Sequence, residues 1–389
     1  MPVQVSVLGA VAAALLVAAI VAFIATPVVR SLAFKIGAVD VPKDNRRMHN
    51  HPIPRMGGLA IFFSFILSAL IFVPLSTPVR GMLLGGVIIV ILGIFDDIYA
   101  LPALPKFFVQ IAAALVAVLM GNQIDILSNP NIFSSEPYWV LGIWSIPISV
   151  LWIVGITNAV NLIDGLDGLA CGVSTISSMT MLVIALTVAE PDTALLMAAL
   201  AGACIGFLPY NLNPAKIFMG DTGSTFLGFI LATVSIDGLF KSYAIISFAV
   251  PFLMLGLPIF DTCFAIFRRV SHGQSPMAPD RGHIHHRLID MGFSQKQAVA
   301  VLYIISAILG LSAVVLTTTN VLKAMLFLLA LCAAGDVSAK LYLDRVNGRN
   351  QSDSPSQGRT GARPRKLHQP PSDVAGNDYF FGEEERSDK

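Results

Sequence analysis

Apolar runs long enough to cross a membrane follow one another along most of the chain. A bilayer core about 30 Å thick is crossed by roughly 20 apolar residues in a helix. Runs of that order are centred at 5–26, 57–75, 80–98, 105–121, 145–163, 168–189, 192–210, 222–239, 243–267, 298–318 and 320–342. The pattern predicts an all-α polytopic membrane protein with eleven transmembrane helices.

The composition agrees with a chain that lies in lipid. Of its 389 residues, 55% are hydrophobic and 13% are charged, and the mean hydropathy is +0.74, whereas a soluble domain carries about 25% charged residues. The four cysteines lie inside apolar runs, so neither a disulfide framework nor a CxxC redox pair is indicated. No Lys or Arg precedes the first run, and we therefore expect a retained span instead of a cleaved signal peptide. Nothing in the composition indicates a nucleic-acid partner.

The basic residues lie in alternate connections between the runs. With the N-terminus outside, 22 of the 25 Lys and Arg residues fall in inner segments. The positive-inside rule therefore predicts an external N-terminus and a cytoplasmic C-terminus. The external connection 122–144 carries Asn129-Pro130-Asn131 between two short runs with β character, which predicts a small hairpin. Residues 346–389 are rich in Ser, Pro, Gly and charge, and we expect a disordered cytoplasmic tail.

Polar side chains within or beside the runs gather at the predicted cytoplasmic side. They are Asp96, Asp97, Asn158, Asn161, Asp164, Asp167, Asn211, Asn213, Asp221 and the stretch 280–287. Carboxylates in a membrane segment are costly and indicate a function. A transporter usually keeps its binding polarity near the midplane, where broken helices expose backbone. The pattern favours an enzyme that works where water meets lipid.

The residue types in this polar set suit phosphoryl transfer. Carboxylates and amides provide oxygen ligands for a divalent cation, and His and Arg side chains suit a polyphosphate. Phosphoryl transfer mainly requires positioning and charge neutralisation. Asn158, Asn161 and Asp164 step by three, so neighbouring pairs can share a helical face, and the glycines that follow favour a helix end or a tight turn. The segment 219–224 opens a span, and we expect its unpaired N–H groups to be available to phosphate.

Five motifs occur in an order that is specific to one family. They are Arg55-Met-Gly-Gly58, Asp96-Asp97 followed by Lys106 and Gln110, Asn158-Ala-Val-Asn161-Leu-Ile-Asp164-Gly-Leu-Asp167-Gly168, Phe218-Met-Gly-Asp221-Thr-Gly-Ser224, and His283-Ile-His285-His286. Over roughly residues 30–300 the chain resembles the polyprenyl-phosphate N-acetylhexosamine-1-phosphate transferases, the superfamily of WecA, TagO and MraY. The histidine loop at 280–287 resembles the WecA and TagO branch and differs from the His-His-His form of the MraY branch.

The resemblance implies an activity at the cytoplasmic face of a bacterial cell membrane. N-acetylglucosamine-1-phosphate would pass from UDP-N-acetylglucosamine (UDP-GlcNAc) to an undecaprenyl or decaprenyl phosphate, giving the lipid-linked sugar pyrophosphate and UMP. This step would initiate synthesis of a cell-envelope polysaccharide. Mg²⁺ is the implied cofactor, with Mn²⁺ as a substitute, and residues 1–345 would form the integral membrane catalytic domain. A homodimer is compatible with the sequence, although no motif requires one.

The resemblance also assigns roles to matching residues. The implied metal ligands are Asp221 and Asn161. The implied catalytic carboxylates are Asp96, Asp97, Asp164, Asp167 and Asp221. The implied substrate-binding residues are Arg47, His49, Arg55, Lys106, Asn158, Asn161, Asp164, Asp167, Phe218, Arg281, His283, His285, His286 and Arg287. Adjacent helical residues point about 100° apart, so one aspartate of the pair, nominally Asp97, is expected to face the acceptor while Asp96 braces the site.

Other interpretations remain open on the sequence alone. The same fold could use another UDP-amino sugar such as UDP-MurNAc-pentapeptide, or the chain could be a transporter or scaffold without catalysis. The His-x-His-His loop could hold Zn²⁺, but no cysteine lies near it and two arginines flank it. Asp261 lies seven residues before Arg268 in an apolar helix. We expect Asp261 to be a buried packing or pairing residue outside the site.

Overall fold

Helices make up most of the part of the chain that the structure describes. The structure is a computed structural model and describes residues 5–41, 52–128, 136, 138–240, 249–275 and 282–318. The α-helices are α1 (Val5–Ile36), α2 (Gly58–Phe72), α3 (Thr77–Tyr99), α4 (Ala103–Leu119), α5 (Ser145–Leu162), α6 (Leu169–Thr187), α7 (Pro191–Asn211), α8 (Gly220–Ser235), α9 (Ala249–Met254), α10 (Gly256–Ser271), α11 (Ile284–Asp290) and α12 (Gln295–Thr318). A 3₁₀ turn (Gly142–Trp144) precedes α5, and a π-helical turn (Ile236–Phe240) follows α8. The strands are β1 (Val39–Asp40), β2 (Ile53–Pro54), β3 (Ile126–Ser128) and β4 (Tyr138–Val140).

Several helices have the length and apolar composition of membrane spans. Among the described residues, six meet both criteria: Ser6–Ile36, Thr77–Tyr99, Gly142–Leu162, Leu169–Thr187, Pro191–Asn211 and Gln295–Thr317. The runs at 57–75 and 105–121 form shorter apolar helices, α2 and α4. The run at 320–342 lies outside the described residues, as does the predicted tail at 346–389. The chain is a mostly helical polytopic membrane protein, and the predicted total of eleven spans stays a prediction.

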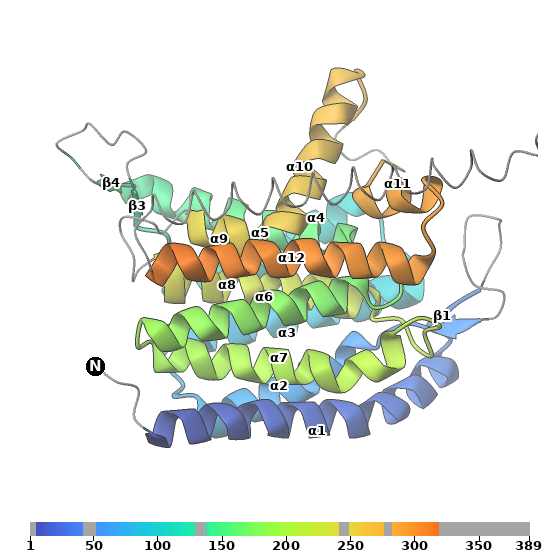
Figure 1. Cartoon of the computed structure of the whole chain (residues 1–389), viewed down its shortest axis with the longest axis horizontal. Helices are drawn as coiled ribbons and strands as arrows, with labels where there is room; N and C mark the ends of the chain where they lie inside the picture. The colour runs from blue at the N-terminus through green and yellow to red at the C-terminus, as the bar shows by residue number, and fades with distance from the viewer. Residues whose placement is uncertain are drawn as a thin grey trace, which may run out of the picture. The chain divides into compact units, whose positions relative to one another are not determined.

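The run at 243–267 does not form one continuous helix, contrary to the prediction. Among its described residues, α9 ends at Met254 and α10 begins at Gly256. Pro258 has no N–H and therefore cannot bond the carbonyl of Met254, four residues earlier. The hydroxyl of Ser177 in α6 donates to that carbonyl instead, at 2.8 Å. Figure 1 shows α10 rising steeply away from the direction of α6, α7 and α12.

Small residues allow the closest approach between helices. α1 packs against α7, with Ala14, Ala18 and Ala22 fully buried. A Cβ atom at Gly202 or Gly206 in α7 would overlap a backbone carbonyl of α1. Glycines four residues apart are a common device for close contact between membrane helices, since dispersion and not the hydrophobic effect drives the packing.

Helix α8 lies among α2, α3, α5 and α6 and carries Asp221 in its first turn. Its residues from Thr222 to Ser235 are all buried. A helix that is apolar on every side is enclosed by its neighbours. The surrounding helices therefore fix the position of Asp221.

Two short antiparallel strand pairs lie at opposite ends of the helices. β3 pairs with β4, Leu127 opposite Trp139, which confirms the predicted hairpin in the connection 122–144. The predicted turn at Asn129-Pro130-Asn131 lies outside the described residues. The β1–β2 pair was not predicted. Figure 1 shows β1 and α11 at one end of the helices and β3 and β4 at the other.

Candidate active site

The first turn of α8 is held by a carboxylate from another helix. The side chain of Asp97 in α3 accepts hydrogen bonds from the backbone N–H groups of Asp221 (2.9 Å) and Thr222 (3.1 Å) and from the Thr222 hydroxyl (2.6 Å). A side chain on Gly220 would overlap the Asp97 carboxylate, and a side chain on Gly93 would overlap the backbone of Thr222. A negative charge at a helix N-terminus also interacts favourably with the positive end of the helix dipole. Asp97 thus fixes the start of α8 and, with it, Asp221.

The contacts of Asp97 differ from those expected of the aspartate that faces the acceptor. The Asp97 side chain is 0% exposed and both of its oxygens accept hydrogen bonds from α8, so it braces the site. It also changes the expectation for residues 219–224. The N–H groups of Asp221 and Thr222, expected to be available to phosphate, donate to Asp97.

One ammonium group lies between two carboxylates. Nζ of Lys106, in the first turn of α4, lies 2.7 Å from Oδ2 of Asp96 and 3.2 Å from Oδ2 of Asp221. Oδ1 of Asp96 accepts the N–H of Leu101 at 2.7 Å. The side chains of Lys106 and Asp221 are 28% and 24% exposed, whereas that of Asp96 is 6% exposed. Asp221 and Lys106 are therefore the members of this group that a solute can reach.

The last turns of α5 add two asparagines. Nδ2 of Asn161 donates to Oδ1 of Asp221 (3.2 Å) and to the hydroxyl of Ser224 (2.8 Å). Nδ2 of Asn158 donates to Gln110 in α4 at 2.7 Å. The structure therefore places Asn161 at the carboxylate cluster. Asn158 instead bonds to Gln110 and thereby links α5 to α4.

The Arg55-Met-Gly-Gly58 motif lies against the segment that opens α8. The N–H groups of Gly57 and Gly58 donate to the carbonyls of Phe218 and Met219 at 2.9 Å, and the N–H of Phe218 donates to Pro54. A Cβ on Gly58 would overlap Cα of Gly223. These backbone contacts place Nε of Arg55 3.8 Å from Oδ1 of Asp97, with a side chain that is 36% exposed.

The turn between α5 and α6 carries Asp164 and Asp167. Helix α5 ends at Leu162, and Gly168 has a φ of +79°, which confirms the predicted helix end and turn. Oδ2 of Asp167 accepts Nδ2 of Asn213 (2.9 Å) and the N–H of Ala215 (3.0 Å), so this carboxylate holds the segment that follows α7. Burial of Asp164, reinforced by the negative charge of Asp221, raises the pKa of its carboxyl to about 7.

The histidine loop lies against that turn. A Cβ on Gly165 would overlap the ring of His285, so only glycine allows this contact. The rings of His283 and His285 are nearly parallel, with centroids 5.7 Å apart, and the ring of His286 lies 4.2 Å from that of His285. Burial of His285, aided by the neighbouring His286, lowers the pKa of its imidazole to about 4. The His285 ring is therefore neutral at neutral pH.

Asp261 in α10 is the partner of the histidine loop. Its Oδ2 lies 2.8 Å from Nδ1 of His283, and its Oδ1 accepts the N–H of Ile284 at 2.8 Å. Both Asp261 and His283 are buried. This confirms that Asp261 is a buried pairing residue but not that it lies outside the site. A carboxylate in the middle of an apolar helix was the sequence signal for such a role.

Of the remaining predicted site residues, some have described contacts and others lie outside the described residues. The guanidinium of Arg287 lies 5.0 Å from the centre of the Phe264 ring, and that of Arg268 lies 5.7 Å from the same ring. Phe218 contributes its backbone contacts with Gly57 and Pro54. Arg47, His49 and Arg281 lie outside the described residues.

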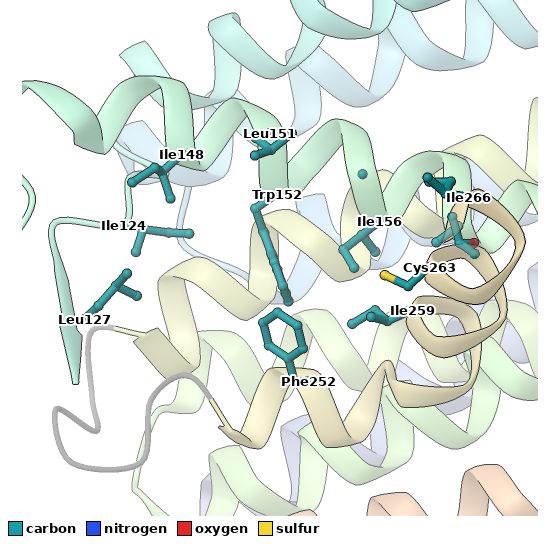
Figure 2. A pocket seen from close by; sticks show the side chains of 13 residues that line it. Ile124, Leu127, Ile148, Leu151, Trp152, Ile156, Phe252, Ile259, Cys263 and Ile266 are labelled. Carbon is teal, nitrogen blue, oxygen red and sulfur yellow. The ribbon is translucent and has the colours of Figure 1, made fainter. Parts of the chain in front are cut away.

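An apolar groove runs along α5 and α10 (Figure 2). Its cavity has a volume of about 410 Å³, and the rings of Trp152 of α5 and Phe252 of α9 contact each other in its lining, with centroids 5.1 Å apart. Ile124 and Leu127 line the end beside β3, and Ala159, two residues before Asn161, lines the other end. The lining is almost wholly apolar. An extended hydrocarbon chain fits such a surface.

Comparisons with known proteins identify the family. The model of glycosyl transferase family 4 matches residues 79–239. The "probable undecaprenyl-phosphate N-acetylglucosaminyl 1-phosphate transferase" of Bacillus subtilis (strain 168) is 45% identical over 309 residues, which cover 79% of this chain and 85% of that protein. The chain belongs to glycosyl transferase family 4.

Two further relatives show the range of the similarity. The decaprenyl-phosphate N-acetylglucosaminephosphotransferase of Mycolicibacterium smegmatis is 36% identical over 77% of this chain and 80% of its own length. A phospho-N-acetylmuramoyl-pentapeptide-transferase of Staphylococcus aureus is more distant, 33% identical over 66% of this chain and 83% of its own length. The similarity to both named activities fits an enzyme of glycosyl transferase family 4 that transfers a sugar-1-phosphate.

The carboxylates of this family 4 member form a compact group in which Asp221 is partly exposed. Within the described ranges, no three His, Cys, Asp or Glu side chains are placed to hold a metal ion together. Mg²⁺ does not need such a cage, since it commonly keeps several waters and binds one or two carboxylates plus substrate phosphates. Asp221 and Asp96 already face one cation, the Lys106 ammonium, at 3.2 and 2.7 Å. The donor set therefore fits a hard divalent ion shared with a phosphate.

Proposed function

We propose that the chain transfers N-acetylglucosamine-1-phosphate from UDP-GlcNAc to a polyprenyl phosphate, releasing UMP. One observation carries the proposal: Asp221, Asp96 and Lys106 form a charged cluster at the end of α5, and the apolar groove lies along the same helix. An anionic headgroup and a long apolar chain can therefore be held next to each other. The printed activities of the Bacillus and Mycolicibacterium relatives support this donor and this class of acceptor.

The groove between α5 and α10 is the proposed site of the acceptor chain. Ile156 and Ala159 of α5 and Ile266 of α10 line it at the end nearer the charged cluster. Isoprenoid units would bury apolar surface there, at about 25 cal/mol per Å². The phosphate would then lie toward Lys106 and Arg55, whose side chains are partly exposed.

The chemistry we propose is a single in-line displacement. An oxygen of the lipid phosphate attacks the β-phosphorus of the donor, which forms one P–O bond. The bond from that phosphorus to the bridging oxygen breaks, and the oxygen leaves with UMP. A phosphomonoester with a second pKa near 6 is about 90% dianionic at pH 7, so a general base adds little. Positioning and charge neutralisation are the main tasks of the protein.

Each side chain has a task that follows from its contacts. Asp221 and Asn161 would hold Mg²⁺, or Mn²⁺ in its place, with Asp96 next to them; the ion would neutralise charge on the donor diphosphate. Lys106 and Arg55 would bind phosphate oxygens. Asp97 would keep Asp221 in place through α8. Asp164, Asp167 and the histidine loop would form the wall of the site that faces the nucleotide sugar.

The test is a product analysis with purified full-length protein. Undecaprenyl phosphate is incubated with UDP-GlcNAc or with UDP-MurNAc-pentapeptide, and the lipid product is identified by its mass. We expect lipid product and UMP from UDP-GlcNAc only. In Asp221→Asn, we expect the rate of UMP release to fall by about 100-fold or more. The matched control is Asp192→Asn, in the first turn of α7. Product from the pentapeptide donor alone would overturn the choice of substrate.

The same preparations separate two further alternatives. A transporter would move solute at a rate that Asp221→Asn does not change, without any UMP release. The cytoplasmic side of the site is tested with membrane vesicles of both orientations. Water-soluble donor added outside should react only with inverted vesicles, in which the cytoplasmic face is exposed. Reaction with right-side-out vesicles would contradict the orientation derived from the basic residues.

A further inference from the structure

Helix α10 holds the segment that leads into α11 at two points. Asp261 bonds His283 and the N–H of Ile284, and Nη1 of Arg268 donates to the carbonyl of Gly282 at 2.9 Å. A Cβ on Gly282 would overlap the Arg268 guanidinium. The two anchors are seven residues apart, about two helical turns, and so project from the same face of α10.

The carboxylate of Asp261 determines which ring nitrogen of His283 carries a proton. An ionised carboxylate can only accept hydrogen bonds. One of its oxygens takes the N–H of Ile284, and the other lies 2.8 Å from Nδ1 of His283. Nδ1 must therefore be the donor, and Nε2 is the nitrogen left for a ligand. Carboxylates behind functional histidines commonly fix tautomer and ring orientation in this way.

The opposite end of the histidine group is fixed as well. The His283 ring lies parallel to that of His285, and Gly165 of the α5–α6 turn leaves space for His285. The stack of rings therefore extends from the buried carboxylate on α10 to the turn that carries Asp164 and Asp167. At the α10 end of the stack, Asp261 lies at hydrogen-bond distance from the ring of His283.

We propose that Asp261 is a positioning residue for the transfer reaction, acting through His283 on the sugar-diphosphate part of the donor. The inference rests on the proposed function and adds a residue to it. Asp261 is buried, so it acts on the donor by aiming Nε2 of His283. Loss of Asp261 should therefore affect the diphosphate and sugar, and leave recognition of the nucleotide unchanged.

The first measurement compares two ligands on Asp261→Asn. The two oxygens of Asp261 each accept one hydrogen bond, whereas the amide of asparagine has one oxygen and one NH₂ donor. The variant therefore loses either the contact that fixes the His283 tautomer or the contact with the Ile284 N–H. We expect kcat/KM for UDP-GlcNAc to fall by about 10- to 100-fold, as for partners behind functional histidines. The affinity for UMP, which lacks the β-phosphate and the sugar, should change by less than about threefold. Asp261→Glu should restore part of the activity, and Phe260→Leu, an exposed neighbour on α10, is the control.

The second measurement is a double-mutant cycle with His283→Ala. If Asp261 acts through His283, adding Asp261→Asn to His283→Ala should change kcat/KM by no more than about twofold. Full activity of Asp261→Asn, or an equal loss with and without His283, would overturn the inference. So would loss of UMP binding and of thermal stability in Asp261→Asn, because the residue would then be structural only. An inactive wild-type protein would instead contradict the proposed function.

Discussion

Two helix starts in this protein are held by the same device, a buried carboxylate from another helix. At α8, Asp97 of α3 accepts the N–H groups of Asp221 and Thr222, and at α11, Asp261 of α10 accepts the N–H of Ile284. In neither case does the residue preceding the helix cap it with its own side chain. Since the first N–H groups of a helix have no partner within it, both starts depend on a distant residue.

The two carboxylates differ in what else they bind. Asp97 directs all of its hydrogen bonds to α8, including that from the Thr222 hydroxyl, and it is completely buried. Asp261 divides its oxygens between the backbone of α11 and the ring of His283. The first arrangement fixes a helix that carries a reactive carboxylate. The second fixes the orientation of a side chain, so its loss should affect catalysis more than stability.

The largest effect is expected for Asp97→Ala. Two backbone N–H groups and one hydroxyl lose their acceptor inside the protein, each at a cost of about 1–3 kcal/mol. We expect a loss of about 3–5 kcal/mol of stability, seen as a lower thermal unfolding midpoint, together with loss of UMP release. Asp192→Ala at the start of α7 serves as the control. A variant that keeps both its unfolding midpoint and its activity would remove the basis for the comparison.

A second variant tests the cluster that Asp97 supports. In Lys106→Met, Asp96 and Asp221 lose the ammonium that lies between them. We expect UMP release to fall about 100-fold, because a phosphate-binding cation is missing. Mn²⁺ binding without substrates, measured by electron paramagnetic resonance, should become about tenfold tighter, since the ion no longer competes with a bound positive charge. Unchanged Mn²⁺ affinity would show that Lys106 and the metal ion do not share a site.

The histidine loop should respond to pH, with a sign that follows from burial. The pKa of His285 is about 4 in the folded protein, against about 6.5 in an unfolded chain. Between these values the unfolded state binds more protons, so stability falls as the pH drops from 6.5 towards 4. The effect should approach about 3 kcal/mol at pH 4. The effect is measured as the difference in stability between wild type and His285→Gln across this pH range.

The gathering of polar residues at one end of the helices was predictable from sequence. Asn161 and Lys106 each lie within hydrogen-bond distance of Asp221, and Lys106 also of Asp96, in the region that their motifs indicated. The binding of a helix start by a carboxylate from another helix was not predictable. Asp97 and Asp221 are 124 residues apart, and a carboxylate that bonds backbone N–H groups leaves no trace in the partner's side chains.

Helix boundaries were also harder to derive than helix identity. The residues from 243 to 267 are mostly apolar, which predicted one helix. Pro251 and Pro258 flank the observed break and were the sequence signal for it. Helix α2 has 15 residues and α4 has 17, below the roughly 20 of a full span. β1 and β2 have two residues each, too few to show an alternating pattern.

The smallest effect, and the sharpest test of the comparison, is expected for Thr222→Val. The substitution removes the hydroxyl that donates to Asp97 at 2.6 Å but keeps the shape of the side chain and both backbone N–H groups. A hydrogen bond to a charged group contributes about 1.5–3 kcal/mol, so a modest drop in the unfolding midpoint should accompany nearly normal turnover. If turnover instead fell as far as in Asp97→Ala, the hydroxyl and not the backbone would position Asp221, and Asp97 would resemble Asp261 in acting through a side chain.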